Sequence, residues 1–456
     1  MPFWKITIAL SALVLVPLCS VLLLAYGAKN VQTPSSTRLA VVEEWIDLLL
    51  VLTEETFGFT PPVAARAFAY AGISVYESVR FADPQLRSLA GQIEGLSLGM
   101  LPKLDSEKTY QWDLVANANL AEIARLLYPT APPLYQARID TLEEEIFAQA
   151  SQNVEVAVAE DSVAFGRRMA HAVALYAASD GQSDAYRRNF PKTFKVVQRE
   201  GAWEKTPNAY KQPLQPYWGN VRTFLKDIAS STLPVPPPAY SMQENAPFFM
   251  YAREVYVATQ QLSREERVIA QFWSDEPGKT ATPSGHSISM LRQVLEAREA
   301  SLSEAALAFA KLGIGLHDSF VACWYAKFFY NTVRPVTVIR KHIDPDFQPL
   351  LETPPFPEYP SGHSVQSAAT AAIMADLFGE QFVLTDRTHE GRSDILEDSR
   401  TFNSFSEMAE EAGMSRLYGG IHFLPAIEEG LKQGRDVGHR VNQTIQFKEP
   451  EPITVP

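Results

Sequence analysis

Apolar residues recur at helical spacing along most of this chain, and patterns typical of β-strands are rare. The stretch LAVVEEWIDLLLVL at residues 39–52 is apolar on more than one face, which is typical of a buried helix. Two prolines open the next pattern, at residues 61–80, where proline favours the first helical turn. Similar patterns cover 107–128, 132–150 and 154–179. The N-terminal half, residues 38–185, is therefore predicted to be a helical bundle.

The character of the sequence changes between residues 186 and 248, which are rich in proline, tyrosine and other aromatic residues. Stretches such as PLQPYWGNVRTF cannot propagate a helix, so this segment is predicted to be a long connecting loop, either a covering lid or a boundary. Helical patterns resume in a C-terminal half, 249–445, which is followed by a tail, 446–456. The predicted helices of this half cover 263–274, 285–298, 303–329, 364–378, 403–418 and 424–443.

The composition limits the kinds of ligand that the chain can bind. Of its 456 residues, 46% are hydrophobic and 20% are charged, which is typical of a globular protein with a sizeable core. The net charge of −13 argues against a nucleic-acid-binding protein, because such proteins bind phosphates through clustered lysine and arginine. Any anionic ligand must therefore be bound by a local basic pocket.

The first residues, 1–28, have the pattern of an export signal. Lys5 precedes an apolar run at 6–24, and small residues follow that run. The pattern predicts either a cleaved signal peptide or a retained membrane anchor, with 29–37 as a polar linker. In both cases the folded chain is expected outside the cytoplasm, as a periplasmic, secreted or membrane-anchored protein. Beyond this segment Cys323 is the single cysteine, which excludes a disulfide framework within the chain and a cysteine metal cluster.

Three short blocks in the C-terminal half contain groups that bind anions or transfer protons. They are Lys327-FFYNTV-Arg334-Pro335, Pro360-Ser361-Gly362-His363 and Ser415-Arg416-LYGGI-His422. Arginine can bind a tetrahedral oxyanion through two parallel hydrogen bonds, and lysine adds a compact charge. Histidine has a near-neutral pKa and can act as a ligand, a nucleophile or an acid–base group. The three blocks together therefore suit a tetrahedral oxyanion.

The spacing of these residues predicts how their side chains converge. Lys327 and Arg334 are seven residues apart, so on one continuous helix they would lie two turns apart on one face, with Pro335 ending the helix. Ser361-Gly362-His363 directly precede an apolar helical pattern, where unpaired N–H groups favour an anion. His422 follows two glycines and precedes a helix-starting proline in the same way. Two helix N-termini are therefore expected to face one anion.

The pattern Lys-x6-Arg-Pro, Pro-Ser-Gly-His and Ser-Arg-x5-His resembles the signature shared by vanadium-dependent haloperoxidases and type 2 phosphatidic acid phosphatases. The resemblance covers about residues 263–443, and the helical first half is compatible with the larger haloperoxidases. It implies an all-α fold of helical bundles of the vanadium haloperoxidase type, with an oxyanion pocket at one bundle end. Vanadate would be the cofactor, and phosphate could occupy the same site.

The resemblance also implies a role for individual residues. Vanadate would be bound by Lys327, Arg334, Ser361, the Gly362 amide and Arg416. His422 would be the axial vanadium ligand, and His363 would be the acid–base group that acts on hydrogen peroxide while a halide is oxidised to a hypohalous-acid equivalent.

Two other functions remain open on the same residues. In a phosphatase acting on phosphomonoesters or lipid phosphates, His422 would attack phosphorus and His363 would protonate the leaving group. The third alternative is a non-catalytic oxyanion-binding protein.

Residues outside the shared signature favour the haloperoxidase. Trp324 and Phe356 resemble the aromatic residues that line the halide pocket of fungal-type vanadium chloroperoxidases, which favours chloride as one of the halides. Asp275 resembles the carboxylate that pairs with the third-block arginine in such enzymes, and it would then hold Arg416 in place.

The sequence departs from the signature at Ala426, where an aspartate is expected four residues after the third-block histidine. A carboxylate that orients the imidazole is therefore missing from its usual place. Asp318 and Glu429 are the candidates to replace it.

The hexapeptide at 282–287, Thr-Pro-Ser-Gly-His-Ser, nearly repeats the one at 359–364. The first copy has no Lys-x6-Arg-Pro ahead of it. His286 is therefore predicted to be structural or to lie at the pocket edge, and its replacement is expected to leave activity largely intact.

Overall fold

The computed structural model describes residues 39–207 and 211–449. The predicted export segment, 1–28, and linker, 29–37, lie outside the described residues, as do residues 450–456 of the predicted tail. The described residues form one compact unit.

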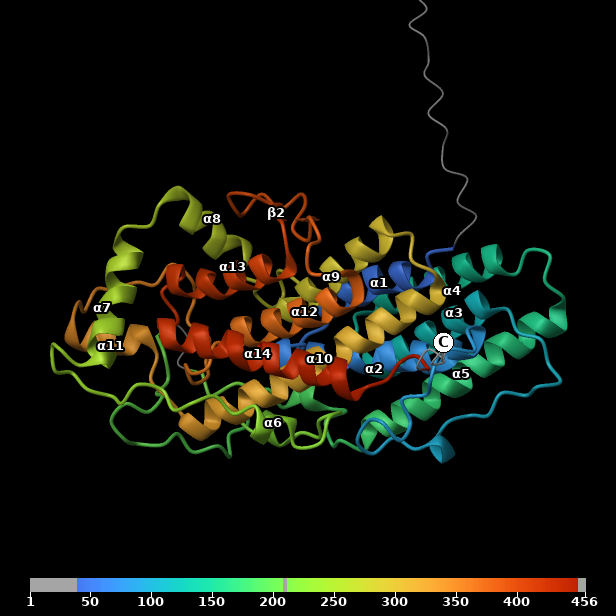
Figure 1. Cartoon of the computed structure of the whole chain (residues 1–456), viewed down its shortest axis with the longest axis horizontal. Helices are drawn as coiled ribbons and strands as arrows, with labels where there is room; N and C mark the ends of the chain where they lie inside the picture. Colours follow the sequence, from blue (N-terminus) through green and yellow to red (C-terminus); the bar gives the residue numbers. More distant parts are fainter. Residues whose placement is uncertain (1–38, 208–210, 450–456) are drawn as a thin grey trace, which may run out of the picture. The chain divides into compact units, whose positions relative to one another are not determined.

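The described residues form helices and one short β-hairpin, which confirms the predicted all-α fold (Figure 1). The N-terminal half contains α1 (Val41–Glu55), α2 (Pro61–Val79), α3 (Trp112–Leu127), α4 (Pro133–Ala150), α5 (Val156–Ala178) and the 3-10 turns η1 (Arg80–Ala82) and η2 (Leu98–Met100). The rest contains η3 (Ala185–Arg187), η4 (Trp218–Asn220), α6 (Ile228–Ser231), α7 (Pro247–Gln260), α8 (Arg264–Phe272), α9 (Thr282–Ala297), α10 (Leu302–Tyr330), α11 (Pro335–His342), α12 (Gly362–Phe378), β1 (Leu384–Asp386), β2 (Arg400–Phe402), α13 (Phe405–Tyr418) and α14 (Leu424–Thr444).

The long helix α10 lies in the core and packs against α2, α12 and α14 (Figure 1). Among the described residues it is the one helix long and apolar enough to cross a membrane, but all of its apolar window is buried inside the protein. Helix α10 approaches α2 closely because glycine has no Cβ. A Cβ on Gly72 of α2 would lie 2.8 Å from the Phe309 carbonyl oxygen of α10. The long apolar run of α10 is thus explained by its place in the core.

The connecting segment, residues 186–248, is attached directly to α10. The Leu214 carbonyl accepts a hydrogen bond from the Trp324 indole N–H at 3.2 Å. Further along, the backbone N–H groups of Phe224 and Leu225 donate to the buried Asp318 carboxylate at 2.8 and 2.9 Å. These contacts hold the segment against the helix that carries Lys327.

The prediction of one continuous helix through Lys327 and Arg334 is wrong. Helix α10 ends at Tyr330, because Asn331 adopts a left-handed conformation with φ of 53°. Arg334 is the N-cap residue of the next helix, α11, and Pro335 is its first residue, where proline is favoured. Proline therefore starts a helix here and does not end one. Helices α7 and α11 were not predicted.

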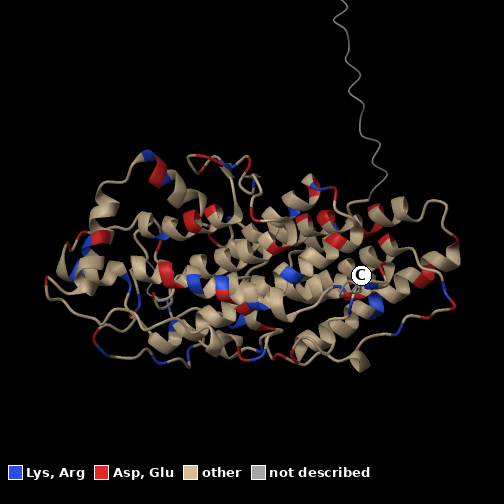
Figure 2. Cartoon of the chain, in the orientation of Figure 1, with Lys and Arg blue, Asp and Glu red and all other residues tan. Residues whose placement is uncertain are grey.

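The β-hairpin pairs strands β1 and β2, and each strand carries a charged residue. Strands β1 and β2 are antiparallel and place Asp386 opposite Arg400. Over the described chain as a whole, basic and acidic residues are interspersed along the helices and loops (Figure 2).

Candidate active site

Lys327 lies in the last turn of α10 and is completely buried. Its ammonium donates to three backbone carbonyl oxygens, those of Pro357 at 2.9 Å, Glu358 at 3.0 Å and Pro360 at 2.5 Å. Burial lowers the lysine pKa to about 7. Because an ammonium has three donors, Lys327 fixes the loop before α12, and an anion would compete with these carbonyls for its hydrogens.

Arg334 reaches the same region from the start of α11. Its Nε donates to the Phe356 carbonyl at 2.9 Å, and its Nη1 donates to the Ile421 carbonyl at 2.8 Å. Its Nη2 has no hydrogen-bond partner among the described residues, although the side chain is buried. A buried guanidinium nitrogen without an acceptor indicates that an acceptor binds there.

Ser361, Gly362 and His363 form the N-terminus of α12. Ser361 is the N-cap residue, and its Oγ accepts a hydrogen bond from the Ser364 N–H at 3.3 Å. A Cβ on Gly362 would lie 3.8 Å from Trp324 and 4.0 Å from Lys327, so any side chain would fill this space. His363 Nε2 has no partner among the described residues. Burial, with the neighbouring positive charge of Arg416, lowers the pKa of His363 well below its usual value.

Arg416 approaches from the last turn of α13 and is also buried. Its Nε donates to Ser415 Oγ at 2.9 Å, and its Nη2 donates to the Trp273 carbonyl at 2.6 Å. The predicted ion pair between Arg416 and Asp275 is not formed, because Asp275 pairs with a histidine described below. A backbone carbonyl, and not a carboxylate, therefore holds the arginine.

His422 precedes α14 and is oriented by Glu358. Its Nδ1 lies 2.9 Å from Glu358 Oε1, which also accepts the Phe423 backbone N–H at 3.0 Å. Its Nε2 lies 3.1 Å from Arg334 Nη1. Since a guanidinium only donates hydrogen bonds, Nε2 must be the acceptor, and the ring proton is on Nδ1, facing Glu358.

Glu358 supplies the carboxylate that is missing at Ala426, and both predicted replacements were wrong. Asp318 accepts backbone N–H groups of residues 224–225, and Glu429 pairs with a lysine on the exposed face of α14. A signal for Glu358 was present, because it is the one charged residue in TPPFPEYPS at 353–361. Its contact with His422 depends on the path of that loop, which the sequence does not reveal.

Trp324 and Phe356 contact each other beside Lys327 and Arg334. Residues that line one pocket, as predicted for these two, must lie this close together. Their ring centroids are 5.0 Å apart at an angle of 50°. The Phe356 ring also faces two cations, with Lys327 Nζ at 5.0 Å and Arg334 Cζ at 4.9 Å from its centroid. The aromatic pair forms an apolar wall that stabilises the buried positive charge.

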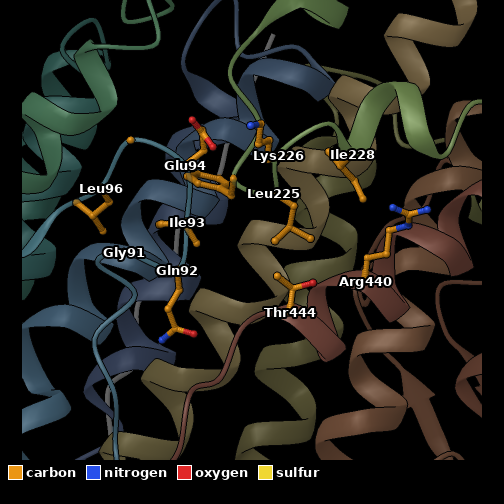
Figure 3. Close-up of a pocket in the computed structure, with 12 residues that line it drawn as sticks. Gly91, Gln92, Ile93, Glu94, Leu96, Leu225, Lys226, Ile228, Arg440 and Thr444 are labelled. Carbon is orange, nitrogen blue, oxygen red and sulfur yellow. The ribbon is translucent and has the colours of Figure 1, made fainter.

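A cavity of about 640 Å³ connects the site to the outside. Its inner end is lined by Gly362, His363, Arg416 and His422, and Trp324 and Phe356 form part of its wall. A second cavity, of about 460 Å³, lies between residues 91–96, residues 224–228 and α14 (Figure 3). Its lining includes none of the three blocks, so the first cavity is the candidate active site.

Comparison with known proteins identifies the family. The family described as VCPO second helical-bundle domain matches residues 307–448. A crystal structure described as the first bacterial vanadium-dependent iodoperoxidase is similar with a TM-score of 0.82 and 33% identity, over 90% of this chain and 98% of that chain. The chain belongs to the vanadium-dependent haloperoxidases. Comparison with curated protein sequences finds no match.

Two further solved structures share the haloperoxidase fold. They are the holo and apo forms of a bacterial vanadium-dependent chloroperoxidase, each with 15% identity. The holo form has a TM-score of 0.61 over 91% of this chain and 94% of that chain. The apo form has a TM-score of 0.63 over 84% of this chain and 92% of that chain.

The family confirms the predicted enzyme class and cofactor, and the residues present fit vanadate. The buried Nη2 of Arg334 and Nε2 of His363 lack partners among the described residues, and Gly362 leaves space beside them. Vanadate held there would supply the Lewis acid that activates hydrogen peroxide for oxidation of a halide. The residues that would hold vanadate are Lys327, Arg334, Ser361, Gly362, Arg416 and His422.

Replacing Glu358 with glutamine should weaken vanadate binding by this haloperoxidase about 10- to 100-fold, the usual range for a group that orients a metal ligand. The amide keeps the size of the side chain but loses the charge that favours the Nδ1–H form of His422. Equilibrium titration with vanadate measures the change. Glu429→Gln is the matched control, because that carboxylate pairs with Lys432 and not with His422. Equal vanadate affinity in Glu358→Gln and wild type would contradict this role.

His286 lies between two buried carboxylates behind the active site. Its Nδ1 is 2.9 Å from Asp275, and its Nε2 is 2.6 Å from Asp386 of strand β1. The Trp273 ring stacks on the imidazole, with centroids 4.6 Å apart, and His389 lies beside it. Despite burial, the two carboxylates raise the pKa of His286 to about 10. The imidazolium therefore neutralises both carboxylates, and it contacts the residue whose carbonyl holds Arg416.

Replacing His286 with glutamine should lower the free energy of unfolding by about 3–5 kcal/mol, because two buried carboxylates lose their cation. The His286 pKa is about 10 in the folded state and 6.5 ordinarily, so this stabilisation is complete below pH 6.5 and is lost toward pH 10. The Asp275 and Asp386 pKa values lie below the ordinary 3.8, so their contribution persists down to that pH. Urea unfolding at pH 6 and pH 10 measures the difference. An equal loss at both pH values would contradict a charged His286.

Proposed function

We propose that this haloperoxidase oxidises iodide with hydrogen peroxide to hypoiodous acid, at the site formed by His363, His422 and three buried cations. The observation that carries the assignment of the site is the buried Glu358–His422 hydrogen bond, because it leaves His422 Nε2 unprotonated toward Arg334. The similarity to a bacterial iodoperoxidase at 33% identity supports iodide as the halide.

The residues of the site have separate tasks in this reaction. Glu358 keeps the His422 proton on Nδ1, so that the unprotonated Nε2 would be available to hold vanadium. His363 is neutral because its pKa is low, so its Nε2 can accept a proton from hydrogen peroxide and return it to the departing oxygen. Arg334 and Arg416 supply the positive charge that stabilises the anionic site.

The hydrogen bonds of Lys327 favour iodide over chloride. All three of its donors are used by backbone carbonyls, so less of its polarising effect is available to activate peroxide than for a free ammonium. A weaker oxidant suits iodide, which loses electrons more readily than bromide or chloride. Trp324 and Phe356 then serve as an apolar wall beside the halide, and chloride is not the preferred ion.

A halide series tests this function with the full chain reconstituted with vanadate. The expected kcat/KM for iodide exceeds that for bromide by about tenfold or more, which corresponds to about 1.4 kcal/mol in the barrier. Hydrolysis of a simple phosphate ester, measured without vanadate, should stay at background. Equal rates with iodide and chloride would contradict the iodide preference, and ester hydrolysis without halide oxidation would contradict the function itself.

We also propose that the enzyme acts outside the cytoplasm. The support is the apolar run at 6–24 with Lys5 ahead of it, which is typical of an export signal or membrane anchor. Cell fractionation of the full chain tests this proposal, since recovery from the cytoplasm alone would contradict it.

A further inference from the structure

Three buried side chains behind the active site have no part in the proposed reaction. Asp275, His286 and His389 are each 2% exposed. Each offers one ligand atom, a carboxylate oxygen or an imidazole nitrogen, and these atoms all lie within 4.8 Å of one another. Two imidazoles and one carboxylate are a donor set that binds zinc and related divalent cations.

One oxygen of Asp275 lacks a partner. Its Oδ2 pairs with His286 Nδ1 at 2.9 Å, but its buried Oδ1 has no hydrogen-bond partner among the described residues. His389 Nε2 lies 3.5 Å from this Oδ1. Neighbouring ligand atoms around a tetrahedral zinc ion are about 3.4 Å apart, because each bond is about 2.0–2.1 Å long. The two separations at Asp275 are therefore close to those of ligands that share one cation.

A second carboxylate, Asp386 of β1, is placed to orient His286. It lies 2.6 Å from His286 Nε2, whereas Nδ1 is the nitrogen that faces Asp275. The Thr388 hydroxyl and backbone N–H donate to the other oxygen of Asp386 at 2.6 and 2.9 Å, which fixes this carboxylate. Metal-binding histidines typically donate their second N–H to a carboxylate, so Asp386 matches the orienting partner of a ligand.

His389 can present its Nε2 to the same point. Burial lowers the His389 pKa to about 4, so the ring is neutral, which is the form that binds metals. Its Nε2 donates to the Phe272 carbonyl at 2.8 Å, and its Nδ1 lies 3.5 Å from Arg392 Nη1, too far to fix the ring tautomer. A cation at Nε2 would move the ring proton to Nδ1, and the Phe272 carbonyl would then be available as the fourth ligand.

Charge favours a divalent cation at this point. Asp275 and Asp386 are both buried, and a divalent cation carries one positive charge for each carboxylate. The cation would replace the proton between His286 Nδ1 and Asp275, and the ring would keep the proton that faces Asp386. Metal ions displace ligand protons in this way when they bind, so the same group can hold either a proton or a cation.

We propose that Asp275, His286 and His389 bind one structural zinc ion. The site ties the loop after α8 and the start of α9 to the connection between β1 and β2, which lies far away in the sequence. It lies against Trp273, whose ring stacks on His286 and whose carbonyl accepts a hydrogen bond from Arg416. Bound zinc would therefore stiffen the support of Arg416 from behind the active site.

Zinc titration of the full chain, after dialysis against a chelator, tests the site without vanadate, peroxide or halide. The wild-type chain should bind one Zn²⁺. His389→Gln keeps a neutral donor for the Phe272 carbonyl but removes the imidazole, and it should raise the Kd by more than about 100-fold, the upper range for residues that only orient a ligand. Asp386→Asn should raise the Kd about 10- to 100-fold. His439→Ala, which removes an exposed imidazole on α14, is the matched control and should keep the wild-type Kd.

Three further measurements separate this site from the vanadate site and from a loss of folding. Zinc binding should persist in His422→Ala, and zinc should raise the thermal unfolding temperature of the wild type but not of His389→Gln. X-ray absorption at the zinc edge of the wild-type complex should show nitrogen and oxygen neighbours at about 2.0–2.2 Å and the outer-shell scattering of two imidazoles. Absence of saturable zinc binding, or binding that is lost in His422→Ala and kept in His389→Gln, would overturn the proposal.

Discussion

Replacing His363 with alanine should lower the rate of vanadate-dependent iodide oxidation by about 10²- to 10⁴-fold, the usual contribution of a positioned acid–base group. His363 lines the inner end of the cavity, and its Nε2 has no hydrogen-bond partner among the described residues. Burial and Arg416 lower its pKa, so the neutral ring is ready to accept a proton from hydrogen peroxide. Steady-state kinetics with saturating vanadate measures the loss.

Two controls separate this role from a structural one. His439→Ala removes an exposed histidine on α14 and should leave the rate unchanged. The vanadate affinity of His363→Ala should fall far less than its rate, because His422, and not His363, is the residue expected to hold vanadium. An unchanged rate in His363→Ala, or a loss explained wholly by weaker vanadate binding, would contradict the acid–base assignment.

Replacing His422 with alanine should abolish vanadate-dependent activity, with a loss of more than about 100-fold, the upper range for residues that only support a ligand. The Nε2 of His422 is the acceptor nitrogen that faces Arg334, and Glu358 holds the ring from the other side. Its removal therefore deletes the proposed ligand and leaves the buried Glu358 without its partner. Activity assays over a wide range of vanadate concentrations measure the loss.

The loss of Glu358's partner could also weaken the fold, so a second variant is needed. Glu358→Gln combined with His422→Ala removes the unpaired buried charge and should recover stability without recovering activity. Full activity in His422→Ala at any vanadate concentration would contradict the assignment.

The sequence predicted the helical fold because long apolar patterns record burial in helices. Helix α10 was predicted at 303–329 and covers Leu302–Tyr330, and α12 and α14 were placed as closely. The error at Arg334 has a local cause. Proline fits both after a helix end and in a first turn, and the left-handed Asn331 that ends α10 cannot be recognised from spacing.

Contacts across loops limited what could be predicted of the site. Each of the three blocks was found, because its residues are close in sequence. The second and third blocks line one cavity, and Arg334 of the first block contacts His422 there. Glu358 reaches His422 from 64 positions away, and Asp386 reaches His286 from 100 positions away. Neither pair follows from helical periodicity. The structural role predicted for His286 agrees with its position between two buried carboxylates, and the small effect of its replacement on activity stays a prediction.

Equilibrium binding of vanadate to the wild-type chain and to His422→Ala, with inorganic phosphate as competitor, measures the contribution of His422 to cofactor binding directly. We predict one vanadate per wild-type chain, displaced by phosphate, and at least about 100-fold weaker binding in His422→Ala. Equally tight vanadate binding by both proteins would contradict the assignment of His422, held by Glu358, as the residue that binds vanadium in this enzyme.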